Sequence, residues 1–351
     1  MCARLHLMKS GKTALCLTSC VLWNIPVAAA AVSTREPAVA VVPELPTTMR
    51  GTIWPRNLGA FIMVVRAENK ANVLSKAIDD TGVKYMIKVI FSDMDGTLLD
   101  ENGQLPAEFD EVMEELKKRN VIFAPTSGRQ YYALMYQMGK YKDDFLFLAE
   151  NGAYSCYREK EMFSSTIDKA EYMKVLHKAM SVPHIYPVVS GKKNSYVLRQ
   201  WEPYIGELHK YYTRAEYVDR FEDIDDDFIK LALADNEYED SVKNIWEPMS
   251  DLDTYLHRTL SSNVWVDYLN PDANKGWAVK KVQEKFGFKP EECAAFGDYM
   301  NDYEMMQSVY YSYAMANAHP DLKKVARFQC KSNVEHGVME QIKEFIRQGM
   351  I

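Results

Sequence analysis

The sequence is poor in cysteine, has no excess of positive charge and contains no long uninterrupted apolar run. Its six cysteines form no CxxC pair, and three lie within the first 20 of 351 residues. This usage argues against a disulfide-stapled scaffold and favours a reducing compartment. A net charge of −7 excludes recruitment of nucleic acid by a basic field. The composition, 47% hydrophobic and 26% charged, excludes a disordered, collagen-like or multi-pass membrane protein, and the length is that of about two domains.

Charge is divided unevenly along the chain, since residues 1–85 carry a balance of +5 and the remaining residues a balance of −12. Within residues 1–31, a basic start, a short apolar stretch and a run of small residues form the pattern of a secretory signal peptide. The alternative is a dispensable leader, because residues 35–50 have a linker-like composition and Met86 offers a clean start. Both alternatives stay open. We expect a cytoplasmic body, or an exported or membrane-tethered one if residues 1–31 act as a signal.

Beyond residue 85 the chain alternates apolar strands with helical patterns at both of its ends. Such alternation predicts an α/β fold with a doubly wound parallel sheet covered by helices on both faces. Strands are expected at 89–92, 121–124, 145–149, 293–296 and 311–315, and helices at 106–119, 130–138, 274–286, 301–308, 320–326 and 335–348.

The middle of the chain has a different pattern and predicts an inserted second α/β unit. We assign residues 86–166 and 269–351 to the core domain and residues 167–268 to the insertion. Within it, strands are expected at 195–199, 228–233 and 263–268, and helices at 168–180, 203–214 and 236–248.

The first chemical signal is a pair of carboxylates, Asp93 and Asp95, directly after an apolar strand. Ligands of open α/β sheets bind beyond the carboxyl ends of strands, and side chains two residues apart point the same way if the strand geometry continues. Two clustered carboxylates repel each other unless a cation lies between them, so a hard cation such as Mg²⁺ is expected. Gly96 permits a sharp exit turn.

Three further signals are weaker when each is taken alone. Ser127 ends a strand and precedes a helix, so it could bind phosphate through its hydroxyl and nearby N–H groups, or simply cap the helix. Lys275 begins a helix and, taken alone, is a surface charge. Asp298, Asn301 and Asp302 follow another strand, where they could complete a metal site or where Asp298 or Asn301 could cap the next helix.

Together, these four signals resemble the motifs of the haloacid dehalogenase superfamily. The stretches DMDGT, TSGR, the lone Lys275 and GDYMND occur in order at strand ends, and the resemblance spans Met86 to the C-terminus. It implies that Asp93 is the nucleophile, forming an aspartyl-phosphate, and that Asp95 is the acid and base. Ser127 with Gly128 would bind the phosphoryl group.

The resemblance also implies roles for Lys275 and for a metal. Lys275 would bind the phosphoryl oxygens and hold Asp93 ionised. Mg²⁺ would be the cofactor; its expected ligands are Asp93, the Asp95 carbonyl and Asp298, with Asn301 and Asp302 in support.

The spacing of the motifs selects a subgroup. Asp95 and Ser127 are 32 residues apart, whereas Ser127 and Lys275 are 148 apart, which leaves room for a cap of about 100 residues only after the second motif. This arrangement resembles the Cof-like type IIB members, which carry an α/β cap of the C2 type. The stretches SGRQYY, AENGA and AMANA resemble the sugar-phosphate phosphatases among them. The resemblance makes Arg129, Asn151 and Gly152 candidate substrate contacts, although the last two could also form a simple tight turn.

Side chains of the expected cap could recognise sugar hydroxyls, although for any single one of them a structural role in the cap is favoured. They are Tyr196, Arg199, Trp201, His209, Tyr211 and Tyr212.

The sequence therefore predicts an Mg²⁺-dependent phosphatase of small phosphorylated metabolites, with sugar phosphates favoured. The expected partner is a small phosphate ester, with no nucleic acid and no membrane for the body, and the oligomeric state stays open. A phosphomutase on the same scaffold is one alternative. A non-catalytic binding module is another, which the presence of Asp93, Asp95, Lys275 and Asp298 disfavours.

Overall fold

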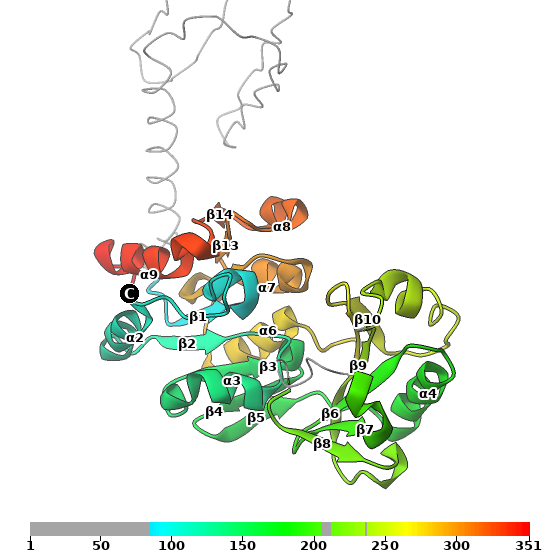
Figure 1. Ribbon diagram of the computed structural model, residues 1–351. Helices are drawn as coiled ribbons and strands as arrows, with labels where there is room; N and C mark the ends of the chain where they lie inside the picture. Colours follow the sequence, from blue (N-terminus) through cyan, green and yellow to red (C-terminus); the bar gives the residue numbers. More distant parts are fainter. Residues whose placement is uncertain (1–84, 205–211, 236) are drawn as a thin grey trace, which may run out of the picture. The chain divides into compact units, whose positions relative to one another are not determined.

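The computed structural model describes residues 85–204, 212–235 and 237–351 (Figure 1). The described residues all belong to one compact unit, Lys70–Ile351. The expectations for residues 1–84, whether signal segment, linker or dispensable leader, lie outside the described residues.

The core is a five-stranded parallel sheet, ordered β14-β13-β12-β1-β2. Every neighbouring pair is parallel, so the predicted doubly wound α/β fold is confirmed. From β1 the chain proceeds to β2 on one side and later to β12 on the other, and the carboxyl ends of β1 and β12 thus meet at the point where the strand order reverses. The strands are β1 (Val89–Ser92), β2 (Ile122–Pro125), β12 (Cys293–Gly297), β13 (Tyr311–Ala314) and β14 (Phe328–Gln329).

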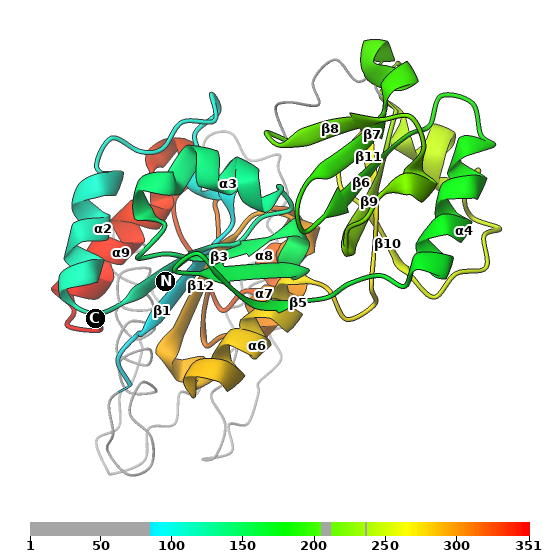
Figure 2. The same cartoon turned by 90° about the horizontal axis from the view of Figure 1, so that it is seen from below.

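Helices cover both faces of this core sheet, and Figure 2 shows α2 and α9 on one face and α6 on the other. All four residues of β1 are buried and all but Ser92 are apolar, as expected for a parallel strand whose two faces are covered. The α2 helix is amphipathic, and only its apolar stripe is buried. The helices are α2 (Phe109–Lys118), α3 (Tyr131–Met138), α6 (Lys275–Phe286), α7 (Tyr303–Ser308), α8 (Pro320–Val325) and α9 (Gly337–Arg347).

Beside the core sheet lies a small antiparallel sheet that the sequence pattern did not predict. It consists of β3 (Leu146–Ala149), β4 (Tyr154–Tyr157) and β5 (Lys160–Ser164). The expected third parallel strand, β3, pairs antiparallel with β4 and is linked to the end of β2 by one parallel bridge between Thr126 and Leu148.

Between β5 and α6 the chain forms a second sheet, ordered β10-β11-β9-β6-β7-β8. Its pairs are antiparallel except β7 with β8. The predicted strands and the helix α4 (Lys169–Met180) are present; β6, β8 and β10 were not predicted. The sheet contains β6 (Tyr186–Gly191), β7 (Ser195–Leu198), β8 (Ala215–Val218), β9 (Phe228–Ala234), β10 (His257–Leu260) and β11 (Trp265–Leu269).

Two helices predicted for this region are wrong in the described part of it. The only helical element within 236–248 is a π-helical turn, Val242–Trp246. Near 203–214 the chain forms a 3₁₀ helix, Arg199–Tyr204, while residues 212–214 are not helical. The second sheet and α4 bury their own apolar cluster, separate from that of the core sheet, as an independent layer must.

Free cysteines are Cys156 and Cys293, both buried, and Cys330, which is partly buried. No helix in the described part of the chain is at once long and apolar enough to cross a membrane.

Candidate active site

Asp93 lies at the carboxyl end of β1, where the chain leaves the sheet. Its N–H donates to the carbonyl of Phe296 in β12 at 3.0 Å, so the neighbouring strand fixes its position. The chain then turns at Gly96, whose φ is +78°. A Cβ at this glycine would collide with the Asp298 carboxylate. Gly96 therefore serves both the turn and the close approach of the two acidic segments.

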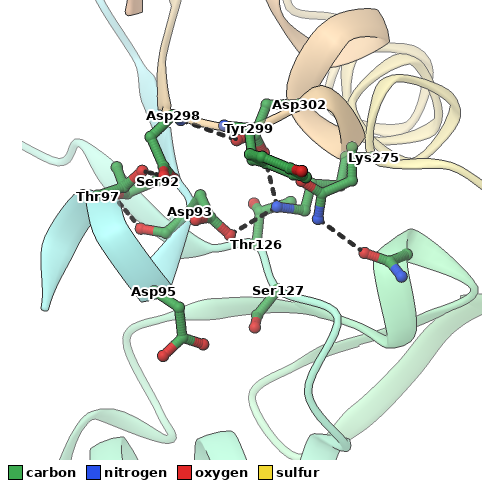
Figure 3. A network of polar contacts seen from close by, with 12 residues as sticks. Ser92, Asp93, Asp95, Thr97, Thr126, Ser127, Lys275, Asp298, Tyr299 and Asp302 are labelled. Atoms are coloured by element: carbon green, nitrogen blue, oxygen red, sulfur yellow. Dashed lines mark hydrogen bonds and ion pairs between the residues drawn. The ribbon is translucent and has the colours of Figure 1, made fainter. Parts of the chain in front are cut away.

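Lys275 is completely buried and lies between two carboxylates (Figure 3). Its Nζ donates to Asp93 Oδ1 and to Asp302 Oδ1, each at 2.6 Å. Asn274 caps the N-terminus of α6 by accepting from the N–H of Trp277 and so fixes the start of the helix. Burial alone would lower the pKa of Lys275, but the attraction of Asp302 and Asp93 outweighs it and holds that pKa above the ordinary value. The simpler expectation of a surface lysine is wrong.

One carboxylate oxygen from each of Asp93, Asp298 and Asp302 lies within 4.8 Å of the others. Three acids meet one ammonium here, so negative charge is in excess. Burial and the neighbouring Asp302 raise the pKa of Asp298 to about 6. Burial likewise raises the pKa of Asp93, against the opposing pull of Lys275. An all-oxygen donor set with excess negative charge fits a hard cation such as Mg²⁺.

Asp302 has a second task, which is to shape the loop after β12. Its Oδ2 accepts from the N–H groups of Asp298 and Tyr299 at 3.0 and 3.2 Å. Asp298 and Asn301, the alternative helix caps suggested by the sequence, do not cap α7, because this helix begins directly after Asp302. Asn301 donates to Asn151 Oδ1 at 3.2 Å instead of facing the acidic cluster, so its supporting role at a metal would be indirect.

Ser127 follows β2 and lies near Asp93 and Asp95 (Figure 3). Its N–H donates to the carbonyl of Leu148 at 2.9 Å, and its Oγ accepts from the N–H of Arg129 at 3.1 Å. It does not cap α3, which begins at Tyr131 with Gln130 in the cap position. Ser127 also lines the cavity described below, so its hydroxyl group remains a candidate phosphate contact.

Asp95 and Arg129 form a two-point ion pair. Arg129 Nε donates to Asp95 Oδ2 at 2.8 Å, and a terminal guanidinium nitrogen binds Oδ1. The Asp95 side chain remains half exposed, whereas that of Arg129 is mostly buried. The expected substrate contact, Arg129, thus contacts the expected acid and base in this structure.

The turn formed by Glu150, Asn151 and Gly152 joins the loops of the site. All three residues have positive φ, at 51°, 55° and 91°, a conformation that costs free energy for the two residues with side chains. The N–H of Asn151 donates to the carbonyl of Ser127 at 2.9 Å, and that of Glu150 to the carbonyl of Arg129 at 3.0 Å. The turn therefore does more than reverse the chain, because it holds the loop after β2.

A cavity of about 660 Å³ opens over these side chains. The core contributes residues around Asp93, Asp95, Ser127, Asn151 and Asp298, including Gly128 and Arg129. The second sheet closes the other side with Tyr212, Lys230, Asp267 and residues 261–265.

Of the six cap side chains considered as contacts for sugar hydroxyls, only Tyr212 is among the described residues that line this cavity. Tyr196, Arg199 and Trp201 do not line it, whereas His209 and Tyr211 lie outside the described residues. Lys230 and Asp267 were not expected at the site, although each is the single charged residue of its strand. That pattern is a usable signal, because a lone buried charge requires a partner.

Comparison with known proteins gives consistent results. A family model described as haloacid dehalogenase-like hydrolase matches residues 90–342. The 5-amino-6-(5-phospho-D-ribitylamino)uracil phosphatase YbjI of Escherichia coli (strain K12) is 29% identical over 265 residues, which are 74% of this chain and 97% of that protein. A crystal structure from Streptococcus mutans UA159 is 28% identical with a TM-score of 0.68, covering 74% of this chain and 99% of the other. A sugar phosphatase of haloacid dehalogenase subclass IIB shares the fold, at 21% identity and a TM-score of 0.63, covering 75% and 100%.

Proposed function

Because the chain belongs to the haloacid dehalogenase-like hydrolase family, we propose that it is a phosphatase that hydrolyses small phosphorylated metabolites, among which we favour sugar phosphates. The observation that carries this proposal is the buried Lys275 held between Asp302 and Asp93, the latter of which lines the cavity. An ammonium in this place offsets the charge that a phosphate would bring beside carboxylates. The activity named for the Escherichia coli relative, removal of phosphate from a ribityl compound, belongs to the same class.

Asp93 is the proposed nucleophile. One of its carboxylate oxygens forms a bond to phosphorus, and the bond from phosphorus to the ester oxygen breaks. The departing alcohol takes a proton from Asp95, which then removes a proton from the attacking water. Hydrolysis of the aspartyl-phosphate releases inorganic phosphate and restores both carboxyl groups. Lys275 opposes protonation of Asp93, which must be ionised for the attack, and Ser127 with Gly128 binds the phosphoryl oxygens.

Arg129 connects the resting structure with this reaction. Asp95 can carry a proton only when the guanidinium of Arg129 no longer binds both of its oxygens. We propose that Arg129 turns to the phosphate of an arriving substrate, which releases Asp95, and that Asn151 and Gly152 complete the contacts on that side. A guanidinium suits this exchange, because it binds carboxylate and phosphate with the same two-point geometry.

A bound Mg²⁺ would balance the excess negative charge of the three acids. It would also stabilise negative charge on the phosphoryl oxygens. Asp93, Asp298 and the carbonyl of Asp95 would hold it, and Asp302 and Asn301 would support them through the contacts described above.

Residues 167–268 form the proposed cap over this site. Tyr212, Lys230 and Asp267 reach the cavity from this region, whereas the proposed chemical groups belong to the core. This division separates the reaction from substrate selection, so the cap sets which phosphate ester is accepted.

The test is release of inorganic phosphate from a panel of sugar phosphates by the wild-type protein and by Asp93→Asn. We expect the variant to lose about 10³-fold or more of kcat, and the control Asp110→Asn, which changes an exposed acid of α2, to stay within about twofold of the wild type. Chelation with EDTA should abolish turnover, and added Mg²⁺ should restore it. Unchanged activity of Asp93→Asn would refute the mechanism. Phosphate release that requires a bisphosphate activator would indicate a mutase instead.

A further inference from the structure

Asp267 is a buried carboxylate whose known contacts all fall on one of its two oxygens. It lies on β11, is 4% exposed and lines the cavity. Its Oδ2 accepts from Ser261 Oγ at 2.8 Å and from Asn151 Nδ2 at 3.5 Å, and Lys230 Nζ lies 3.8 Å from the same oxygen. Among the described residues, no donor lies within hydrogen-bond distance of Oδ1. Oδ1 is not one of the buried side-chain atoms that lack a partner, so it is open to the cavity, where it can accept a hydrogen bond from a ligand.

The nearby lysine does not serve the free oxygen, because it is already engaged elsewhere. Lys230 Nζ lies 2.6 Å from Glu150 Oε2 and donates to the carbonyl of Gly128 at 2.9 Å. Two buried carboxylates, Glu150 and Asp267, thus share one ammonium. Lys230 donates no hydrogen bond to Oδ1 of Asp267, so this oxygen remains available to a hydrogen-bond donor in the cavity.

The cavity wall around Asp267 has the chemistry of a site for a hydroxylated carbon chain. Residues 261–263 are two serines and an asparagine, and they line the cavity with Trp265 and Tyr212. The rings of Tyr212 and Trp265 are 5.9 Å apart at an angle of 58°. Hydroxyl and amide groups can exchange hydrogen bonds with a polyol, and aromatic faces pack against its C–H groups.

We propose that Asp267 determines substrate specificity by accepting, at Oδ1, a hydrogen bond from a hydroxyl group of the leaving alcohol, so that the preferred substrates are phosphate monoesters of sugars or polyols. This inference rests on the proposed phosphatase function. It assigns Asp267 no part in the chemical step, since the reacting groups lie in the core. Ser261 is then a positioning residue, because it holds Oδ2 and thereby directs Oδ1 into the cavity.

The experiment compares kcat/KM for two substrates, ribitol 5-phosphate and para-nitrophenyl phosphate, which has no aliphatic hydroxyl. Asp267→Ala should lower the value for ribitol 5-phosphate by about 10- to 100-fold and leave that for para-nitrophenyl phosphate within about threefold. Asp267→Asn and Ser261→Ala should give smaller losses with the same selectivity, and these two variants decide the matter if Asp267→Ala does not fold. A merely structural role would lower both values together.

The matched control is Asp235→Ala. Asp235 is also fully buried and follows β9 in the same sheet, but its carboxylate binds Tyr238 and Asn244, and it does not line the cavity. We expect this variant to leave the ratio of the two kcat/KM values unchanged. Equal losses on both substrates in the Asp267 variants, or no loss on ribitol 5-phosphate, would overturn the inference. If the wild-type protein releases phosphate from neither ester, the proposed function itself fails.

Discussion

Replacing Lys275 by methionine tests the electrostatics of the site without any substrate. The ammonium is fully buried and binds two carboxylates at 2.6 Å, and methionine has a similar length but no charge. Removing one partner from a buried ion pair costs about 3–5 kcal/mol, since the remaining charge is left uncompensated. We therefore expect the free energy of unfolding to fall by about 4 kcal/mol, which is roughly a 10³-fold change in the folding equilibrium. This corresponds to a decrease in Tm of about 8–16 °C.

The loss should depend on pH in a defined direction. Burial already raises the pKa of Asp93, and Lys275 is the main group that opposes this rise. Without Lys275, the folded variant holds a proton on Asp93 at a pH where the unfolded chain has released it. Stability of the variant therefore increases as the pH falls from the raised folded pKa toward the unfolded value near 4. The difference between wild type and variant should be smaller at pH 5 than at pH 7.5.

The assay is urea unfolding followed by circular dichroism at both pH values, with EDTA present so that no divalent cation replaces the lost charge. Lys281→Met is the matched control, because Lys281 is an exposed lysine of the same helix with an ion pair to Glu284. It should change the free energy of unfolding by less than about 0.5 kcal/mol. A Lys275→Met protein within about 1 kcal/mol of the wild type at pH 7.5, or a loss equal at both pH values, would refute the reasoning.

Two further predictions concern the metal site and its turn. The pKa of Asp298 is raised to about 6, and a metal requires the deprotonated acid. The affinity for Mg²⁺ measured by calorimetry should therefore be about tenfold higher at pH 7 than at pH 5. An equal affinity at both pH values would contradict the role of Asp298. Gly96→Ala should lower the free energy of unfolding by about 2–3 kcal/mol and weaken Mg²⁺ binding, because the added Cβ meets Asp298. The control is Gly103→Ala, since Gly103 has a similar φ of +71° but open space around it. This control should cost only about 1 kcal/mol and leave Mg²⁺ binding unchanged. Similar losses in both glycine variants would show that backbone strain alone matters.

The core could be predicted from the sequence because its signals are local. The apolar run of β1 followed by Asp93 and Asp95 identifies a buried parallel strand and its functional end together, and the rule on strand ends then brings Asp298 beside them. The sheet order bears this out, since β1 and β12 are neighbours. The embedded position of Lys275 had no local signal, and only the family resemblance connected it with the acids.

The second sheet was harder to predict because its pattern is ambiguous. The segment 236–248 has apolar residues at helical spacing, yet tertiary contacts leave only a short turn at Val242–Trp246. The six buried residues of β6 show no alternation that would mark a strand. Lys230 and Asp267 were missed because their partners lie in distant segments of the chain. The ion pair of Lys230 with Glu150 is an example, and no spacing along the sequence reveals such partners.

The register of the core sheet also has a consequence for how the chain is made. Val89 of β1 pairs with Cys293 of β12, a partner that is synthesised 204 residues later. At about 5–20 residues per second, roughly 10–40 s pass during which one edge of the mostly apolar strand β1 has no neighbour. Such an edge invites pairing with other chains, and a sequence separation this large slows folding. The proposed nucleophile Asp93 and Lys275 therefore meet only late in synthesis. Pairing of β12 with β1 both covers this strand edge and brings the segment of Asp298 beside Asp93.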